Sequence, residues 1–292
     1  MASTDSPNRP FTLTGRQPLN VVLRPGSPAE AAFRTAALEP GFEPAHELDL
    51  QYLGGKTLPQ LGFRLVYLGR WSAADRRALD ASLPAAMSDP GLNDVVAQYF
   101  PGQTVRSTFT GSTARRDAVS TRVDKPEVES LVRHLGPADG AVTGLLLPRG
   151  VVLVDGDVTS ERGLAGYHGS LHVSGRTLYY AVAVYSEGTN GIVAFDEPWK
   201  NVCATLYHEL QEVRTDPDVE DAIRARRSPD ATHFLGWYSP RGGEIADIPI
   251  AEADGQLGLV MKEVPLAAGG TAPVQLLWSN RVGGPEGPAT TS

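Results

Sequence analysis

Residues 208–212 read His-Glu-Leu-Gln-Glu, a spacing that places two side chains able to bind a metal one helical turn apart. Four residues of α-helix turn the chain by about 400°, so His208 and Glu212 lie on one face. Glu209, one step around the helix, can hold a water molecule beside an ion bound there. The string differs from the H-E-x-x-H motif of zinc peptidases only in its last residue. It predicts a metal-dependent hydrolase.

A catalytic zinc site needs a third protein ligand, which we expect downstream of the helix. The segment Gly-Glu-Ile-Ala-Asp at 243–247 offers two carboxylates. Glu244 is the favoured third ligand, and Asp247 either supports His208 from outside the ligand shell or is an alternative ligand. Asp216 is another option, although its position just before a proline also suits a cap on the next helix.

The predicted reaction is hydrolysis of a peptide or amide bond by a metal-activated water. Glu209 acts first as general base and then as general acid, carrying the water's proton to the leaving group. Zinc is the expected ion. A carboxylate in place of the second imidazole adds negative charge, which shifts the preference toward harder cations such as Mn²⁺ or Ca²⁺.

Two further side chains are candidate catalytic residues. His168 stands between glycines in Gly-Tyr-His-Gly and is expected at a loop or strand edge. It would face the cleft as a ligand or as an oxyanion-stabilising donor, or else make a structural hydrogen bond. Tyr238 either donates to a substrate oxygen or packs as a buried aromatic. His172, which alternates with apolar neighbours, is expected to face solvent.

The element that must position the motif is a helix over 198–214. It starts with a proline after two acidic residues and ends before Pro217, because a residue that precedes proline avoids the α region. Further expected helices are 73–83, capped by Ser72, and 92–99, 126–135 and 219–227. Expected strands are 63–68, 104–110, 150–154, 171–173, 177–185, 257–260 and 274–278, with a hairpin turn at Gly175 and a loop over 233–247.

Strands and helices alternate without a strict βαβ rhythm, which indicates an α+β class. We expect a mixed sheet with an active-site helix and a smaller C-terminal lobe. The 292 residues, 41% of them hydrophobic, suffice for a core. We expect one catalytic-type domain over 17–282, with lobes of about 17–195 and 196–282. Residues 1–16 and 283–292 are predicted to be flexible tails.

Charge and cysteine usage exclude several classes of function. The net charge of −8 disfavours a nucleic-acid partner, and the single cysteine, Cys203, excludes an intrachain disulfide and a thiolate zinc site. No apolar signal segment opens the chain and no stretch reaches about 18 apolar residues. We expect a cytoplasmic protein with no membrane partner and a peptide-like or small-molecule substrate. The oligomeric state cannot be predicted.

Motifs along most of the chain resemble those of the phosphate-induced (Exordium-like) proteins and their bacterial relatives, a group with a zincin-like site. They are Leu-Val-Tyr-Leu-Gly-Arg-Trp at 65–71, Gln-Tyr-Phe at 98–100, Gly-Tyr-His-Gly at 166–169, residues 208–217, Gly-Trp-Tyr at 236–238 with 243–247, and Val-Gln-Leu-Leu-Trp-Ser-Asn at 274–280. The resemblance implies a zincin-like fold in which His208, Glu212 and the Glu244/Asp247 pair form one site.

Three departures from the family pattern bear on the role. Members are typically secreted, whereas no leader is visible here. They often carry a cysteine soon after the Glu-Ile-x-Asp block, where this chain has Pro249. The segment 218–235 is longer than usual, and an added helix there would reshape the cleft. One interpretation of these differences is that the protein has a specialised intracellular role and acts on a small peptide-like metabolite.

Alternatives to a metallohydrolase stay open at this point. The chain could be a non-catalytic module that keeps the fold and binds Ca²⁺ or another ligand, or that forms a buried polar network around His208. It could also be a metal-free hydrolase with His208 and Glu209 as an acid–base pair. In the catalytic interpretation the strand 177–185 is expected to be the sheet edge along which a peptide-like substrate lies.

Overall fold

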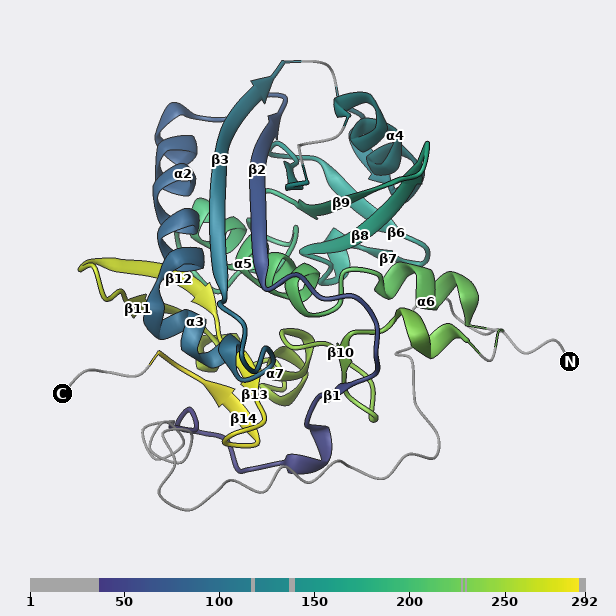
Figure 1. The fold of residues 1–292 in the computed structure, drawn as a ribbon. Coiled ribbons are helices and arrows are strands. Elements are labelled where there is room, and N and C mark those ends of the chain that lie inside the picture. Colours follow the sequence, from purple (N-terminus) through teal and green to yellow (C-terminus); the bar gives the residue numbers. More distant parts are fainter. Residues whose placement is uncertain (1–36, 117–118, 137–139, 227, 229, 289–292) are drawn as a thin grey trace, which may run out of the picture.

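The structure is a computed structural model that describes residues 37–116, 119–136, 140–226, 228 and 230–288 (Figure 1). The predicted tail 1–16 lies outside these residues. The described chain is a mixture of helices and several sheets, consistent with the predicted α+β class. Its helices are η1 His46–Leu48, α2 Ala73–Ser88, α3 Pro90–Ala97, α4 Lys125–Leu135, η2 Ser160–Arg162, α5 Pro198–Thr215, α6 Val219–Ala225, η3 Ala231–Phe234, α7 Asp247–Glu252 and η4 Leu257–Leu259.

The largest sheet has five strands in the order β3-β2-β5-β9-β8, namely Arg106–Arg115, Gln60–Leu68, Val142–Leu146, Arg176–Ala183 and Gly166–Val173. Strands β3, β2, β5 and β9 pair in parallel, whereas β8 is antiparallel to β9 and forms the edge. The predicted mixed sheet is therefore present. The expectation that 177–185 forms the edge is wrong, because β5 pairs with the free side of that strand.

Smaller sheets surround the central one. They are β4 Arg122–Asp124 with β6 Val152–Asp155 and β7 Val158–Thr159; β1 Gln51–Tyr52 with β10 Trp237–Tyr238; β11 Met261–Pro265 with β12 Thr271–Gln275; and β13 Leu277–Ser279 with β14 Gly284–Glu286. The predicted tail 283–292 is thus wrong in its first part. Despite its glycine and proline, β14 is buried and paired with β13.

The central sheet is covered on both faces, as the alternation of side chains along β2 shows. Phe63, Leu65 and Tyr67 pack in one apolar cluster with α2, α3 and α5, while Val66 and Leu68 pack in another with α4. A strand buried on both faces has a near-continuous run of apolar residues. The sequence has such a run, Leu-Val-Tyr-Leu, at 65–68. The α2 and α4 helices lie on either side of the sheet in Figure 1.

Predictions that depend only on residues adjacent in the sequence, such as a helix cap and a hairpin turn, are confirmed. The Ser72 hydroxyl accepts the Asp75 N–H at 2.9 Å and caps α2, which runs past its predicted end to Ser88. The hairpin turns at Ser174 and Gly175, both with positive φ (49° and 76°), as a two-residue turn of type I′ requires. Two predictions are wrong: residues 257–260 contain η4 rather than a strand, and 233–247 contains η3 and β10.

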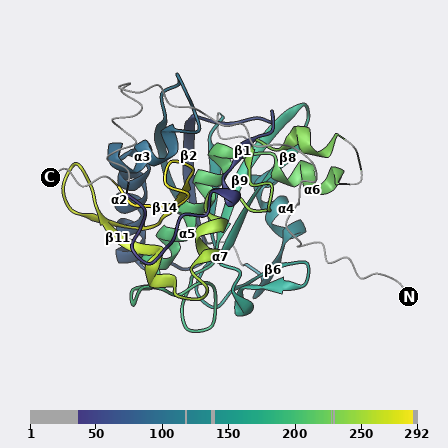
Figure 2. The same cartoon turned by 90° about the horizontal axis from the view of Figure 1, so that it is seen from below.

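Helix α5 lies in the middle of the molecule in both views (Figures 1 and 2). It contacts α2, β8, β9 and β12, so it lies between the central sheet and the β11–β12 hairpin. The main apolar cluster joins side chains from both predicted lobes, including Leu65, Leu206 and Val274. Among the described residues no helix has the length and apolar content needed to cross a membrane.

Candidate metal centre

The site helix α5 is held in place by apolar packing and by one buried arginine. Val202, Leu206, Leu210 and Val213 pack in the main core. Arg214 is fully buried and donates to Gln211 Oε1 at 2.8 Å, Ser107 Oγ at 2.6 Å and the Pro59 carbonyl at 2.8 Å. These bonds hold the last turn of α5 against the N-terminal ends of the parallel strands β2 and β3. They therefore fix the position of residues 208–212 relative to the central sheet.

The predicted pairing of His208 with Glu212 is present. His208 Nε2 lies 3.1 Å from Glu212 Oε2, as the helical spacing requires. Asp247, at the start of α7, places Oδ1 3.6 Å from the same nitrogen. Glu209 Oε1 lies 3.9 Å from it. Ligand atoms that share an ion at about 2.1 Å lie roughly 3.0 to 3.4 Å apart. The separation of His208 from Glu212 falls in this range, that of His208 from Asp247 is slightly longer, and Glu209 lies farther away, beside the ligand positions.

The orientation of the His208 ring is set by Gln275, which the sequence analysis did not identify as a site residue. Gln275 Nε2 donates to the Ala246 carbonyl at 2.5 Å, so its Oε1 must face His208 Nδ1, 2.6 Å away. That oxygen only accepts, so Nδ1 carries the proton and, in the neutral ring, Nε2 offers its lone pair to the pocket. The signal in the sequence that could have identified it is a single polar residue in the predicted strand 274–278, which is otherwise apolar.

His168 lies on the edge strand β8, as predicted, and approaches the same carboxylates from there. Its side chain is buried. Its Nε2 donates to the Asp216 carbonyl at 3.2 Å. Its Nδ1 therefore faces Glu212 Oε2 at 3.4 Å and Glu209 Oε2 at 3.5 Å. Glu244 Oε1 lies 3.6 Å from Nε2. His168 thus lies within the candidate metal centre.

A glycine allows β8 and α5 to approach this closely. A Cβ added to Gly166 would lie 2.4 Å from the Val182 carbonyl oxygen, 2.9 Å from Thr205 Cγ2 and 3.1 Å from Glu209 Oε1. The first two contacts are shorter than van der Waals separations permit. The glycine before Tyr167 is therefore needed for the contact between the site helix and the edge strand.

The downstream acids divide between the two histidines. His208, Glu212 and Asp247 form one group in which an atom of each residue lies within 4.8 Å of the others. His168, Glu212 and Glu244 form a second such group. Glu244, the favoured third ligand, is therefore grouped with His168 rather than with His208. Asp247, the alternative, is grouped with His208.

Asp216 does not cap the next helix. Its Oδ1 accepts the Gly236 N–H at 2.8 Å, and the N-cap residue of α6 is Asp218, whose side chain makes no capping bond. The proline after Asp216 ends α5, and the carboxylate is drawn toward the loop before β10 instead. Burial raises the pKa of Asp216 to about 7.

Tyr238 and His172 lie away from the carboxylates. Tyr238 is buried in a cluster with Val219, Ala222 and Leu235, and it is absent from the described lining of the pocket. It adopts the packed-aromatic alternative. His172 faces solvent as predicted, with 55% of its side chain exposed, and contacts Asp221 Oδ2 at 2.8 Å.

The site residues perturb one another's protonation. Burial acts to raise the pKa of Glu212, but the two imidazoles outweigh it and hold the pKa at about 2. Burial acts to lower the pKa of His208, but Glu212 and Glu209 outweigh it and raise the pKa to about 10. Burial raises the pKa of Glu209 and of Glu244. Without a cation, protons on the imidazoles balance these carboxylates.

The carboxylates line a pocket of about 320 Å³. Its described lining contains six acidic residues and two histidines but no lysine or arginine: Asp155, Glu209, Glu212, Glu220, Glu244, Asp247, His168 and His208. Glu212 Oε1 and Glu244 Oε1 are buried without a hydrogen-bond partner. Buried oxygens of this kind are costly unless a cation or water satisfies them. The donor set therefore fits a divalent cation.

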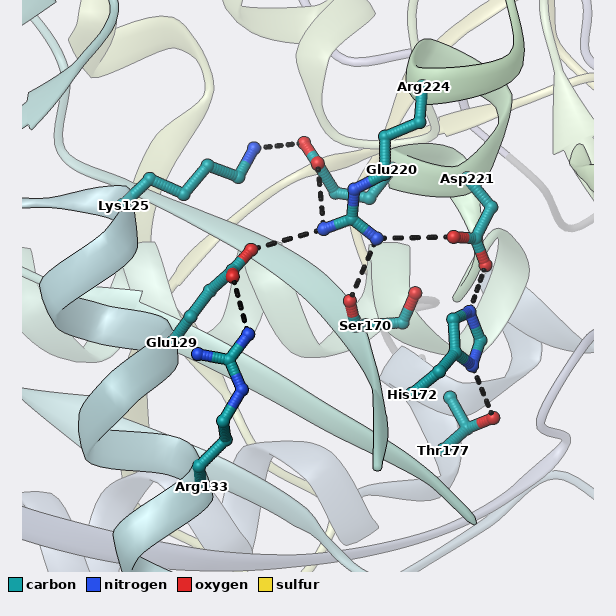
Figure 3. A network of polar contacts seen from close by, with 9 residues as sticks. All are labelled: Lys125, Glu129, Arg133, Ser170, His172, Thr177, Glu220, Asp221 and Arg224. Atoms are coloured by element: carbon teal, nitrogen blue, oxygen red, sulfur yellow. Dashed lines mark hydrogen bonds and ion pairs between the residues drawn. The ribbon is translucent and has the colours of Figure 1, made fainter. Parts of the chain in front are cut away.

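Helix α6 forms one wall of the pocket through Val219, Glu220 and Ile223. Figure 3 shows the ion pairs that hold it. Arg224 reaches Glu129 of α4 at 3.1 Å and Asp221 at 3.2 Å, and Lys125 pairs with Glu220. Arg224 Nη1 also donates to the Ser170 carbonyl on β8 at 3.4 Å. The segment 218–235 thus contains a helix, α6, that lines the pocket.

Comparisons of the chain with protein-family models, with curated proteins and with solved structures found no match.

Proposed function

We propose that this protein is a metal-dependent hydrolase that cleaves a peptide or amide bond. The observation that carries the proposal is the 3.1 Å approach of His208 Nε2 to Glu212 Oε2, with Glu209 beside them in a pocket lined by acids. Zinc is the proposed ion, and Mn²⁺ is the alternative that suits the carboxylate-rich donor set.

His208, Glu212 and Asp247 would hold the ion. When bound, a divalent cation supplies a Lewis acid and lowers the pKa of a coordinated water toward neutrality. Glu209 would act as the base, since burial raises its pKa and so makes it a stronger proton acceptor than an exposed carboxylate. It would then pass the proton to the leaving amine. His168 Nδ1, 3.5 Å from Glu209 Oε2, would orient this base.

The proposed substrate is peptide-like and would lie along the outer edge of β8. The Ala165 carbonyl bonds to Val184 next to β9, whereas the Ser170 carbonyl meets Arg224 on the opposite side. Backbone groups alternate along a strand, so those of Gly166 and His168 point away from β9, toward a bound peptide. Adding a substrate strand there would bring its backbone beside Glu209.

We also propose that the fold is zincin-like and that the resemblance to the phosphate-induced (Exordium-like) family reflects kinship. Support comes from the site helix packed against a mixed sheet whose edge strand is antiparallel. The motifs that carry the resemblance also converge: 166–169, 208–217, 243–247 and 274–280 each contribute a residue that contacts the candidate centre.

The test is metal content together with turnover of peptide libraries. We expect a bound divalent ion, loss of hydrolysis with retained metal in Glu209→Gln, and loss of both in His208→Ala. Absence of stoichiometric metal, with hydrolysis unchanged in Glu209→Gln, would overturn the proposal.

The alternative is a non-catalytic module that keeps the same fold. It is favoured by the direct contacts between both imidazoles and Glu212, which already form a buried polar network. A chelator that lowers the melting temperature, in a protein that hydrolyses no peptide, would select this alternative.

A further inference from the structure

We propose that the pocket holds two divalent cations bridged by Glu212, rather than the single ion of the proposed function. The inference rests on that function for the first ion, held by His208, Glu212 and Asp247. The second ion would be held by His168, Glu212 and Glu244. Only Glu212 belongs to both groups.

The position of Glu212 suits a bridging carboxylate. Its Oε2 lies 3.1 Å from His208 Nε2 and 3.4 Å from His168 Nδ1, so imidazoles from two different elements approach it together. Its Oε1 is buried and has no hydrogen-bond partner. A carboxylate that bridges two ions uses both oxygens, which gives the unpartnered oxygen a ligand.

A second buried oxygen points to the same conclusion. Glu244 Oε1 has no hydrogen-bond partner, and only 9% of the Glu244 side chain is exposed. It does not belong to the group of His208, Glu212 and Asp247, yet an atom of Glu244 lies within 4.8 Å of atoms of both His168 and Glu212. One ion at His208 would leave Glu244 Oε1 buried without a hydrogen bond or a metal ligand bond.

Both histidines are prepared in the same way. One N–H of each ring donates to an oxygen that can only accept. His208 Nδ1 donates to the Gln275 side-chain oxygen, and His168 Nε2 donates to the Asp216 carbonyl oxygen. The other nitrogen of each neutral ring offers a lone pair to the carboxylates. This outer hydrogen bond is typical of metal-binding histidines, and here it occurs twice.

The charge of the four carboxylates beside the two histidines suits two divalent ions better than one. Glu209, Glu212, Glu244 and Asp247 carry four negative charges when ionised, and no lysine or arginine lies in the described lining. With neutral imidazoles, one divalent ion leaves two charges uncompensated, and two ions leave none. The two groups together supply three carboxylates and two histidines, one carboxylate fewer than di-iron and di-manganese carboxylate centres have, and paired ions in hydrolases lie about 3.5 to 4 Å apart.

The test is the number and coupling of bound Mn²⁺ ions in the full chain after metal removal. We expect calorimetric titration to give two equivalents, and electron paramagnetic resonance to show a spin-coupled pair. Glu244→Gln should bind one uncoupled equivalent. Glu220→Gln, which alters an acid of the same pocket outside both groups, should still bind two.

One equivalent in the unaltered protein, with Glu244→Gln unchanged, would overturn the second site and leave the proposed function standing. Two equivalents without spin coupling would also overturn it, because the ions would not share Glu212. Absence of any bound metal would remove both proposals together. The resonance measurement on the unaltered chain keeps the test decisive if Glu244→Gln does not fold.

Discussion

His168 on β8 and His208 on α5 direct ring nitrogens at the same atom, Glu212 Oε2, from 3.4 Å and 3.1 Å. The edge strand and the site helix therefore meet at one carboxylate oxygen. Small changes in how β8 packs on α5 will alter both histidine contacts together.

Replacing Gln275 by leucine should weaken metal binding without removing a ligand. The substitution deletes the acceptor of the His208 Nδ1 proton, so the ring loses its fixed orientation. Loss of such an outer partner costs about 10- to 100-fold in metal affinity. Calorimetric titration with Zn²⁺ checks this. Gln256→Leu, on the surface, is the matched control, and equal affinities in the two variants would contradict the prediction.

The sequence predicted those parts of the centre that depend on local periodicity. The helical spacing of His208 and Glu212 is a property of one segment, so it needs no tertiary information. The choice between Glu244 and Asp247 depends on how the chain from 236 to 247 folds back, which no local pattern records. The edge was misassigned because β5, a short strand that includes Gly144, was not predicted, and its pairing with β9 leaves β8 outermost.

Replacing Arg214 by methionine should lower the free energy of unfolding by about 3 kcal/mol or more. The guanidinium is fully buried, and its removal leaves acceptors on Gln211, Ser107 and Pro59 without donors, each at a cost of about 1 to 3 kcal/mol. Urea unfolding followed by circular dichroism measures the change. Arg77→Met, on the exposed side of α2, should change stability by less than about 0.5 kcal/mol.

Replacing Arg224 by alanine should loosen α6 while leaving global stability nearly unchanged. Arg224 is 42% exposed, so its ion pairs with Glu129 and Asp221 contribute at most about 1 kcal/mol. Hydrogen exchange of residues 219–225 should nevertheless accelerate, because these contacts hold the pocket wall. Arg133→Ala removes a pair with Glu129 inside α4 and should leave exchange in α6 as it was. Faster exchange in both variants would refute a specific role for Arg224.

The metal-free protein should lose stability as pH rises from 5 to 9. His208 has its pKa raised from 6.5 to about 10, so its contribution is complete below pH 6.5 and is lost as pH rises through 10. Asp216, whose pKa is raised from 3.8 to about 7, adds to the loss between these values. A bound cation replaces these protons, so the melting temperature should fall less when Zn²⁺ is present. Parallel pH curves with chelator and with Zn²⁺ would contradict this.

Replacing Gly166 by alanine should separate β8 from α5. The new Cβ would lie 2.9 Å from Thr205 Cγ2 on α5 and 2.4 Å from the Val182 carbonyl oxygen on β9, so β8 must shift relative to both elements. We expect a loss of about 1 to 3 kcal/mol in unfolding free energy, as for other overpacked interiors. Because the shift moves His168 relative to Glu212, Zn²⁺ affinity should fall by about tenfold or more. Gly258→Ala, at a position with no atom within 4 Å, is the matched control. If Gly166→Ala binds Zn²⁺ as tightly as that control, contact between β8 and α5 does not set the geometry of the centre.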